Sequence, residues 1–102
     1  MSVKITQQQP GQFVIEGELN MQTVPDASKQ LAELLGGPSD STLVFDLAGV
    51  SRSDSAGVAL LVEAMQMAKA QARELSFSHL PQQMQAIAKV SGLLDILPIS
   101  SN

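Results

Sequence analysis

Asp54 and Ser55 stand side by side, immediately before a long apolar segment with helical periodicity, Val58 to Ala68. Either side chain can accept a hydrogen bond from the first free N–H groups of a helix, and one such cap is enough. If Asp54 is the cap, the Ser55 hydroxyl is left free at the positive end of the helix. A phosphate there would gain about 0.3–1 kcal/mol per charge from the helix dipole, although the Asp54 carboxylate would oppose it. The pair therefore indicates either two structural caps or a serine whose phosphorylation alters an interface.

The expected helix from Ala56 to Ala72 carries apolar residues on two sides. One side has the spacing of a core face: Val58, Leu61, Val62, Met65, Ala68 and Ala72. A second apolar stripe begins beside Ser55: Ala56, Leu60, Ala64 and Met67. Either another element of the chain covers this stripe, or it is exposed and binds a partner. We take the second alternative as the hypothesis, with Leu60 and Met67 exposed in the free protein.

On this hypothesis the partner-binding residues extend from the loop before the helix along its second stripe. They are Arg52, Asp54, Ser55, Ala56, Gly57, Leu60, Glu63, Ala64 and Met67. Gly57 is included because a glycine permits a partner's backbone to approach closely.

Residues for catalysis or metal binding are scarce. The chain has no cysteine and one histidine, His79, which we expect to be a surface or satisfied side chain. A triad of Ser55, His79 and an aspartate is disfavoured because the chain has no Gly-x-Ser-x-Gly turn. We interpret Asp46 as the polar end of a strand, and no glycine-rich phosphate loop is present. The sequence therefore predicts no enzyme activity, no metal and no cofactor.

Composition narrows the class of partner. The 102 residues suit a single domain, 1–102, and 44% are hydrophobic. A net charge of −4 with no Trp or Tyr disfavours nucleic acid and anionic membranes. The amino terminus lacks a signal-peptide pattern, and Val58 to Ala68 is too short to span a bilayer. We expect a cytoplasmic protein with no direct membrane insertion, reaching any membrane through another protein.

Four short strands are expected. Val3 to Ile5 and Phe13 to Gly17 flank a Gln9-Pro10-Gly11 turn, which predicts an antiparallel hairpin. Leu43 to Leu47 and Leu75 to Phe77 are short apolar runs typical of buried strands.

Helices alternate with the later strands. The first follows Thr23, a predicted cap, has Asp26 at a capping-box position, and stops at Gly36-Gly37-Pro38. A third helix runs from Pro81 to Gly92. This alternation predicts an α/β domain with parallel strands, in which the loop from Ala48 to Ser55 follows a strand's carboxyl end.

These motifs together resemble the STAS family, which contains anti-sigma factor antagonists, cytoplasmic domains of sulfate transporters and stand-alone subunits. The likeness rests on Phe45-Asp46-Leu47, Val50, Asp54-Ser55-Ala56-Gly57, Gly17-Glu18-Leu19 and Ser91-Gly92-Leu93. The resemblance implies a mixed four-stranded sheet with an N-terminal antiparallel hairpin and flanking helices.

Within the family, the chain is most similar to the cytoplasmic subunit of phospholipid-transporting ABC systems. This similarity rests on Val50 to Ser55, Gly57 to Val62, Leu80-Pro81, Ala88-Lys89 and Leu97-Pro98. It implies a protein that binds the transporter's ATPase subunit at the inner face of the inner membrane. Such a subunit supports the transporter's assembly and activity, and thereby outer-membrane lipid asymmetry, without hydrolysing ATP itself.

One difference keeps a second function open. The transporter subunits carry threonine at the position of Ser55 and glycine at that of Ala56. Asp-Ser-Ala-Gly equally resembles an anti-sigma factor antagonist, in which Ser55 would be the phosphorylated switch and the partner an anti-sigma factor serine kinase.

Overall fold

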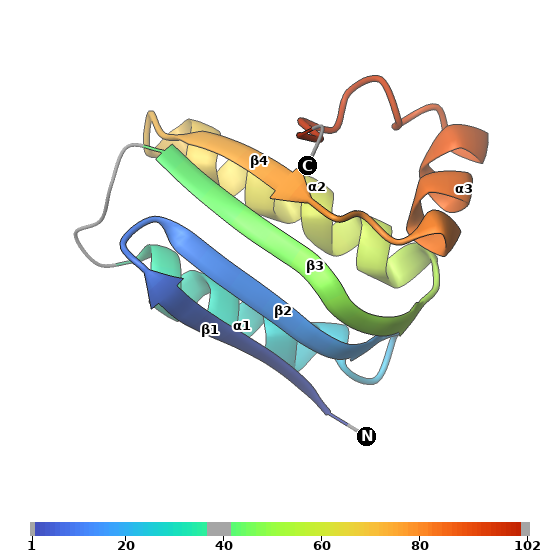
Figure 1. Ribbon diagram of the computed structural model, residues 1–102, viewed down its shortest axis with the longest axis horizontal. Helices are drawn as coiled ribbons and strands as arrows, with labels where there is room; N and C mark the ends of the chain where they lie inside the picture. Colours follow the sequence, from blue (N-terminus) through green and yellow to red (C-terminus); the bar gives the residue numbers. More distant parts are fainter. Residues whose placement is uncertain (1, 37–41, 101–102) are drawn as a thin grey trace.

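The computed structural model describes residues 2–36 and 42–100, which form a four-stranded sheet and three helices (Figure 1). The elements are β1 (Val3–Gln9), β2 (Gln12–Leu19), α1 (Val24–Leu35), β3 (Thr42–Ser53), α2 (Ser55–Ala70), β4 (Glu74–Ser78) and α3 (Gln82–Val90). The strand order is β1-β2-β3-β4, with β1 and β2 antiparallel and the other pairs parallel. The predicted mixed sheet with an N-terminal hairpin and flanking helices is confirmed.

Helices α1 and α2 cover one face of the sheet, and α3 packs against α2 beyond the end of β4 (Figure 1). Phe13, Phe45 and Phe77 lie in register across β2, β3 and β4, and all three side chains are fully buried. The Phe13 and Phe45 rings stack with centroids 4.9 Å apart, and the Phe45 and Phe77 centroids are 6.4 Å apart. This row of rings joins the three strands beneath an otherwise aliphatic core.

Strand β3 is longer than its apolar run. We expected a strand over Leu43 to Leu47 and a loop from Ala48 to Ser55, but the strand continues to Ser53. Its second half pairs with β2 through Leu19↔Ser53, with two register shifts that mark bulges. Backbone pairing therefore orders this polar stretch without an apolar pattern, and Asp54 alone separates β3 from α2.

The start of α1 differs from the predicted capping box. Thr23 makes no side-chain cap; its hydroxyl donates to the Glu18 carbonyl at 2.7 Å and accepts from the Asn20 N–H at 3.0 Å. Asp26 instead accepts a hydrogen bond from Gln30. These bonds of Thr23 stabilise the preceding turn. Of the expected stop signal, Gly37 and Pro38 lie outside the described residues.

The prediction that α2 carries an exposed apolar stripe is wrong. Leu60 and Ala64 are buried, with only 2% and 3% of their surface exposed, and Met67 is half-buried against the core. Helix α1 packs along this side of α2, where the Ser28 hydroxyl donates to the Glu63 carboxylate. Because α1 lies against one side of α2 and α3 also packs against it, the helix needs apolar residues on more than one face.

This burial predicts that Leu60→Asp unfolds the protein. A carboxylate at this position would lose its hydration without gaining a partner, so we expect a loss of more than about 3 kcal/mol in unfolding free energy. Urea unfolding followed by circular dichroism measures it. The control Ala59→Asp, at the exposed neighbouring position, should change stability by less than about 1 kcal/mol. A wild-type midpoint for Leu60→Asp would show that the stripe is accessible.

Candidate functional site

The ends of β2 and β3 meet the starts of α2 and α3 around a small polar hollow of about 220 Å³. Its lining residues are Glu18, Leu19, Asn20, Arg52, Ser53, Asp54 and Gln83. The Asp54 N–H donates to the Leu19 carbonyl at 3.1 Å, and the Ser53 N–H donates to Gln83 Oε1 at 3.0 Å. These bonds fix the chain just before α2, so the first turn of the helix has a defined position at the edge of the hollow.

Asp54 is the cap of α2. Its backbone is extended, and its carboxylate accepts from the Ala56 N–H at 2.8 Å. Ser55 begins the helix and is exposed, and within the described residues its hydroxyl makes no hydrogen bond. Of the arrangements that the sequence left open, the structure adopts the one in which Asp54 caps and Ser55 is free to contact another molecule.

Gly57 has an internal role instead of the expected contact with a partner. It is buried, and a Cβ there would lie 2.0 Å from Ser53 Oγ and 2.9 Å from the Leu19 Cβ. Only a residue without a side chain lets α2 approach the ends of β2 and β3 this closely. Gly57 therefore positions Ser55 and Asp54 but does not face solvent.

The remaining predicted partner residues divide by exposure. Arg52, like Asp54 and Ser55, is exposed, whereas Ala56 and Glu63 are half-buried. Glu63 is held by Ser28 of α1. The predicted residues are thus accessible mainly at the amino-terminal end of α2.

Two exposed residues at this end were missed from the sequence. Met21, in the turn between β2 and α1, has 77% of its surface exposed, and it follows Asn20, which lines the hollow. Ala59, one turn after Ser55, is also exposed. A methionine among the polar residues of the turn Asn20-Met21-Gln22-Thr23 was the available signal. We call Met21, Arg52, Asp54, Ser55 and Ala59 the α2 tip.

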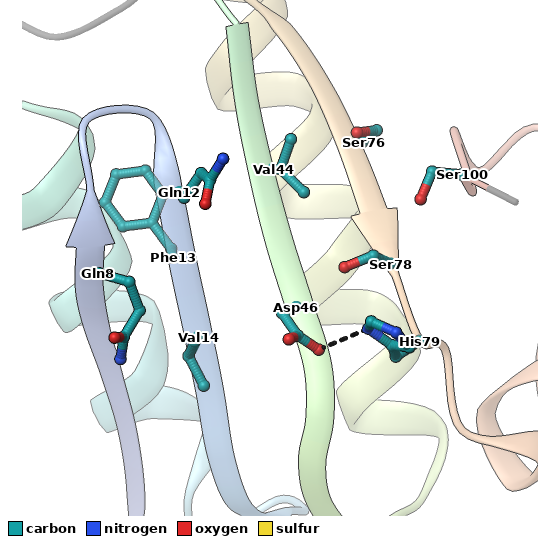
Figure 2. Close-up of a pocket in the computed structure, with 10 residues that line it drawn as sticks. All are labelled: Gln8, Gln12, Phe13, Val14, Val44, Asp46, Ser76, Ser78, His79 and Ser100. Atoms are coloured by element: carbon teal, nitrogen blue, oxygen red, sulfur yellow. Dashed lines mark hydrogen bonds and ion pairs between the residues drawn. The ribbon is translucent and has the colours of Figure 1, made fainter. Parts of the chain in front are cut away.

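A second hollow of about 360 Å³ lies on the sheet, where side chains from all four strands and the carboxyl-terminal segment meet (Figure 2). Figure 2 shows its lining: Gln8, Gln12, Phe13, Val14, Val44, Asp46, Ser76, Ser78, His79 and Ser100. His79 Nδ1 lies 3.0 Å from Asp46 Oδ1, which also accepts from the Ala48 N–H. His79 is therefore a satisfied surface histidine as expected, while Asp46 lies within β3 and not at its end.

His79 lines this second hollow, whereas Ser55 does not. Within residues 2–36 and 42–100, no three His, Cys, Asp or Glu side chains gather to hold a metal ion. Nor does any helix in that part of the chain have the length and apolar character needed to cross a membrane. We take the α2 tip as the candidate site because Asp54 caps the helix there and leaves the exposed Ser55 hydroxyl without a hydrogen bond in the described part of the chain.

A family model described as "Mlab, STAS domain" matches residues 4–98. This match covers nearly all of the chain, which therefore belongs to the STAS domain family.

Solved structures share the fold. The anti-sigma factor antagonist SpoIIAA in its unphosphorylated form is 19% identical, with a TM-score of 0.74 over 98% of this chain and 89% of that one. Bacillus SpoIIAA in its phosphorylated form is 20% identical, with a TM-score of 0.69 over 98% and 92%. An anti-sigma factor antagonist from Mycobacterium paratuberculosis is 18% identical, with a TM-score of 0.76 over 98% and 85%. At these identities the likeness establishes the fold alone.

The cap assignment predicts different effects for two neighbouring alanine substitutions. Asp54→Ala removes the acceptor for the Ala56 N–H and should lower the unfolding free energy by about 1 kcal/mol. Ser55→Ala removes an exposed hydroxyl and should change it by less than about 0.5 kcal/mol. Urea unfolding of both variants checks the assignment. A larger loss for Ser55→Ala would make Ser55 the cap.

The close approach at Gly57 predicts that Gly57→Ala is destabilising although alanine favours helices. The added methyl group meets Ser53 Oγ and Leu19, which should cost about 1–3 kcal/mol of unfolding free energy. Ser53→Ala removes the nearer atom, so the double variant should be more stable than the sum of the two single changes implies. Additive losses in a double-mutant cycle would contradict this account.

Proposed function

We propose that this chain is a non-catalytic, cytoplasmic STAS subunit of a phospholipid-transporting ABC system, most similar to MlaB. It would bind the transporter's ATPase subunit at the inner face of the inner membrane and support assembly and activity. The transporter would maintain the lipid asymmetry of the outer membrane. The description of the matching family model and the motifs shared with such subunits support this proposal.

The observation that carries the binding role is the free hydroxyl of Ser55 at an exposed helix start. Ser55 and the small Ala59 side chain let a partner approach the first turns of α2. Met21, which follows Asn20 of the polar hollow, supplies an adaptable apolar contact. Arg52 and Asp54 add charges around this contact. An exposed methionine with surrounding polar groups fits a protein partner better than a small ligand.

The remaining residues of the predicted interface would act indirectly. Leu60, Ala64 and Gly57 are buried, so they fix α2 against α1 and the sheet. The half-buried Ala56 lies in the first turn of α2, whereas the half-buried Glu63 and Met67 lie further along the helix. Binding would therefore concentrate at the α2 tip and not along a helical ridge.

A second candidate is an anti-sigma factor antagonist switched by phosphorylation of Ser55. It is favoured by the same free hydroxyl and by the likeness to SpoIIAA, which is known in unphosphorylated and phosphorylated forms. A phosphate on Ser55 would add about −1.5 to −2 charges beside Asp54 and repel a partner seated there. In this case the partner would be an anti-sigma factor serine kinase.

Capture from the native cytoplasm separates the two functions. The tagged wild-type protein should retain an ABC ATPase. Ser55→Asp and Ala59→Asp, which place a charge in the contact, should weaken binding of that purified ATPase at least about tenfold in calorimetry. Ala32→Asp is the matched control, because Ala32 is exposed near the carboxyl-terminal end of α1 and is not part of the α2 tip. This variant should bind the ATPase as wild type does.

Capture of a serine kinase and ATP-dependent phosphate on Ser55 would establish the second function instead. Full ATPase binding by both Ser55→Asp and Ala59→Asp would remove the α2 tip from the interface.

A further inference from the structure

The outer edge of β1 is closed by a side chain from α1. The Ile5 N–H donates to Gln30 Oε1 at 2.8 Å, and Gln30 Nε2 donates to the Val3 carbonyl at 3.0 Å. We propose that this edge is a surface able to accept a strand from a second copy of this chain, and that Gln30 keeps it shut. The inference is independent of the partner bound at the α2 tip.

The geometry follows from the pairing of β1. In an antiparallel pair, alternate residues direct both backbone groups toward the neighbouring strand. Ile5 directs its N–H outward to Gln30, so its carbonyl also points outward, and the same holds for Val3 and Gln7 two residues away. The Gln30 amide therefore bonds the outward backbone groups on either side of Lys4: its oxygen accepts from the Ile5 N–H and its NH₂ group donates to the Val3 carbonyl. An added strand would offer the same two groups at that place.

The amide is held in this orientation. Gln30 Nε2 also donates to Asp26 Oδ2, one turn earlier on α1, at 2.9 Å. This bond directs the NH₂ group toward Asp26 and Val3, which leaves the oxygen facing the Ile5 N–H. Val3 and Ile5 are buried on the side of the sheet covered by α1, so strand and helix keep a fixed distance.

The rest of the sheet boundary is already protected. At β4, the Phe77 N–H donates to the Pro98 carbonyl and the Ser100 N–H donates to the Phe77 carbonyl, so the carboxyl-terminal segment covers that edge. At the far end of β1, a register shift between Gln7 and Gln9 interrupts regular pairing. The stretch from Val3 to Gln7 is therefore where a strand could add, and Gln30 occupies its middle.

A second copy is the occupant that fits. Two identical edges pair antiparallel about a two-fold axis and would extend the four-stranded sheet across both molecules. The edge from Val3 to Gln7 has no proline, and Lys4 is its one charged residue, so a single charge on each copy would oppose pairing between two edges.

Gln30→Leu tests the proposal. Leucine is one atom shorter than glutamine and has neither a donor nor an acceptor, so the substitution removes both hydrogen bonds to β1. At low protein concentration, the Ile5 amide should exchange with solvent at least about tenfold faster in NMR. At higher concentration, sedimentation should show self-association at least about tenfold tighter than that of wild type. Gln66→Leu, which adds the same side chain at an exposed position of α2, should behave as wild type.

Two further variants make the result specific. Adding Gln7→Pro to Gln30→Leu removes an outward N–H from the edge and should restore the monomer, because an edge strand tolerates proline at such a position. Gln30→Ala is measured in parallel, since it opens the same edge without introducing a large apolar group. An unchanged sedimentation coefficient for both Gln30 variants would overturn the proposal. So would association that Gln7→Pro does not reverse, or equal association by Gln66→Leu.

Discussion

The packing of the first turn of α2 against the ends of β2 and β3 is the contact on which the rest of the structure depends. Gly57 brings the helix close to Leu19 and Ser53, and the Asp54 N–H bonds to the Leu19 carbonyl. This contact sets where α2 starts, so it determines both the exposure of Ser55 and the depth at which Leu60 is buried. The candidate site is therefore a product of core packing and not a separate addition to the fold.

The element order, the hairpin, the parallel strands and the place of the cap before α2 could be predicted from local signals, but which of Asp54 and Ser55 is the cap was left open. Turn residues, short apolar runs and paired capping residues act within a few positions of one another. The second half of β3 could not, because its order comes from bulged pairing with β2 and not from an apolar pattern. Thr23 does not act as a cap because its hydroxyl forms hydrogen bonds with the Glu18 carbonyl and the Asn20 N–H instead.

Which side of α2 is exposed could not be predicted from the sequence of α2 alone. Two apolar stripes are equally consistent with a docking helix and with a central helix, and only the positions of α1 and α3 decide. Residues of the α2 tip such as Met21 come from a distant turn, so no spacing within α2 indicates them. The site takes residues from a turn, from the end of β3 and from the start of α2, and the sequence indicated it through Arg52 and the pair Asp54 and Ser55.

The row of Phe13, Phe45 and Phe77 has a consequence for how the chain reaches this fold. Helix α1 lies between the first two rings in the sequence and α2 between the last two, so no ring can stack before a whole crossover has closed. Closing each crossover lowers the entropy of the chain before the aromatic contact can form and offset that loss. The central sheet therefore assembles through non-local contacts, and we expect the rate of folding to be set by the joining of β2, β3 and β4, with helix formation the faster event.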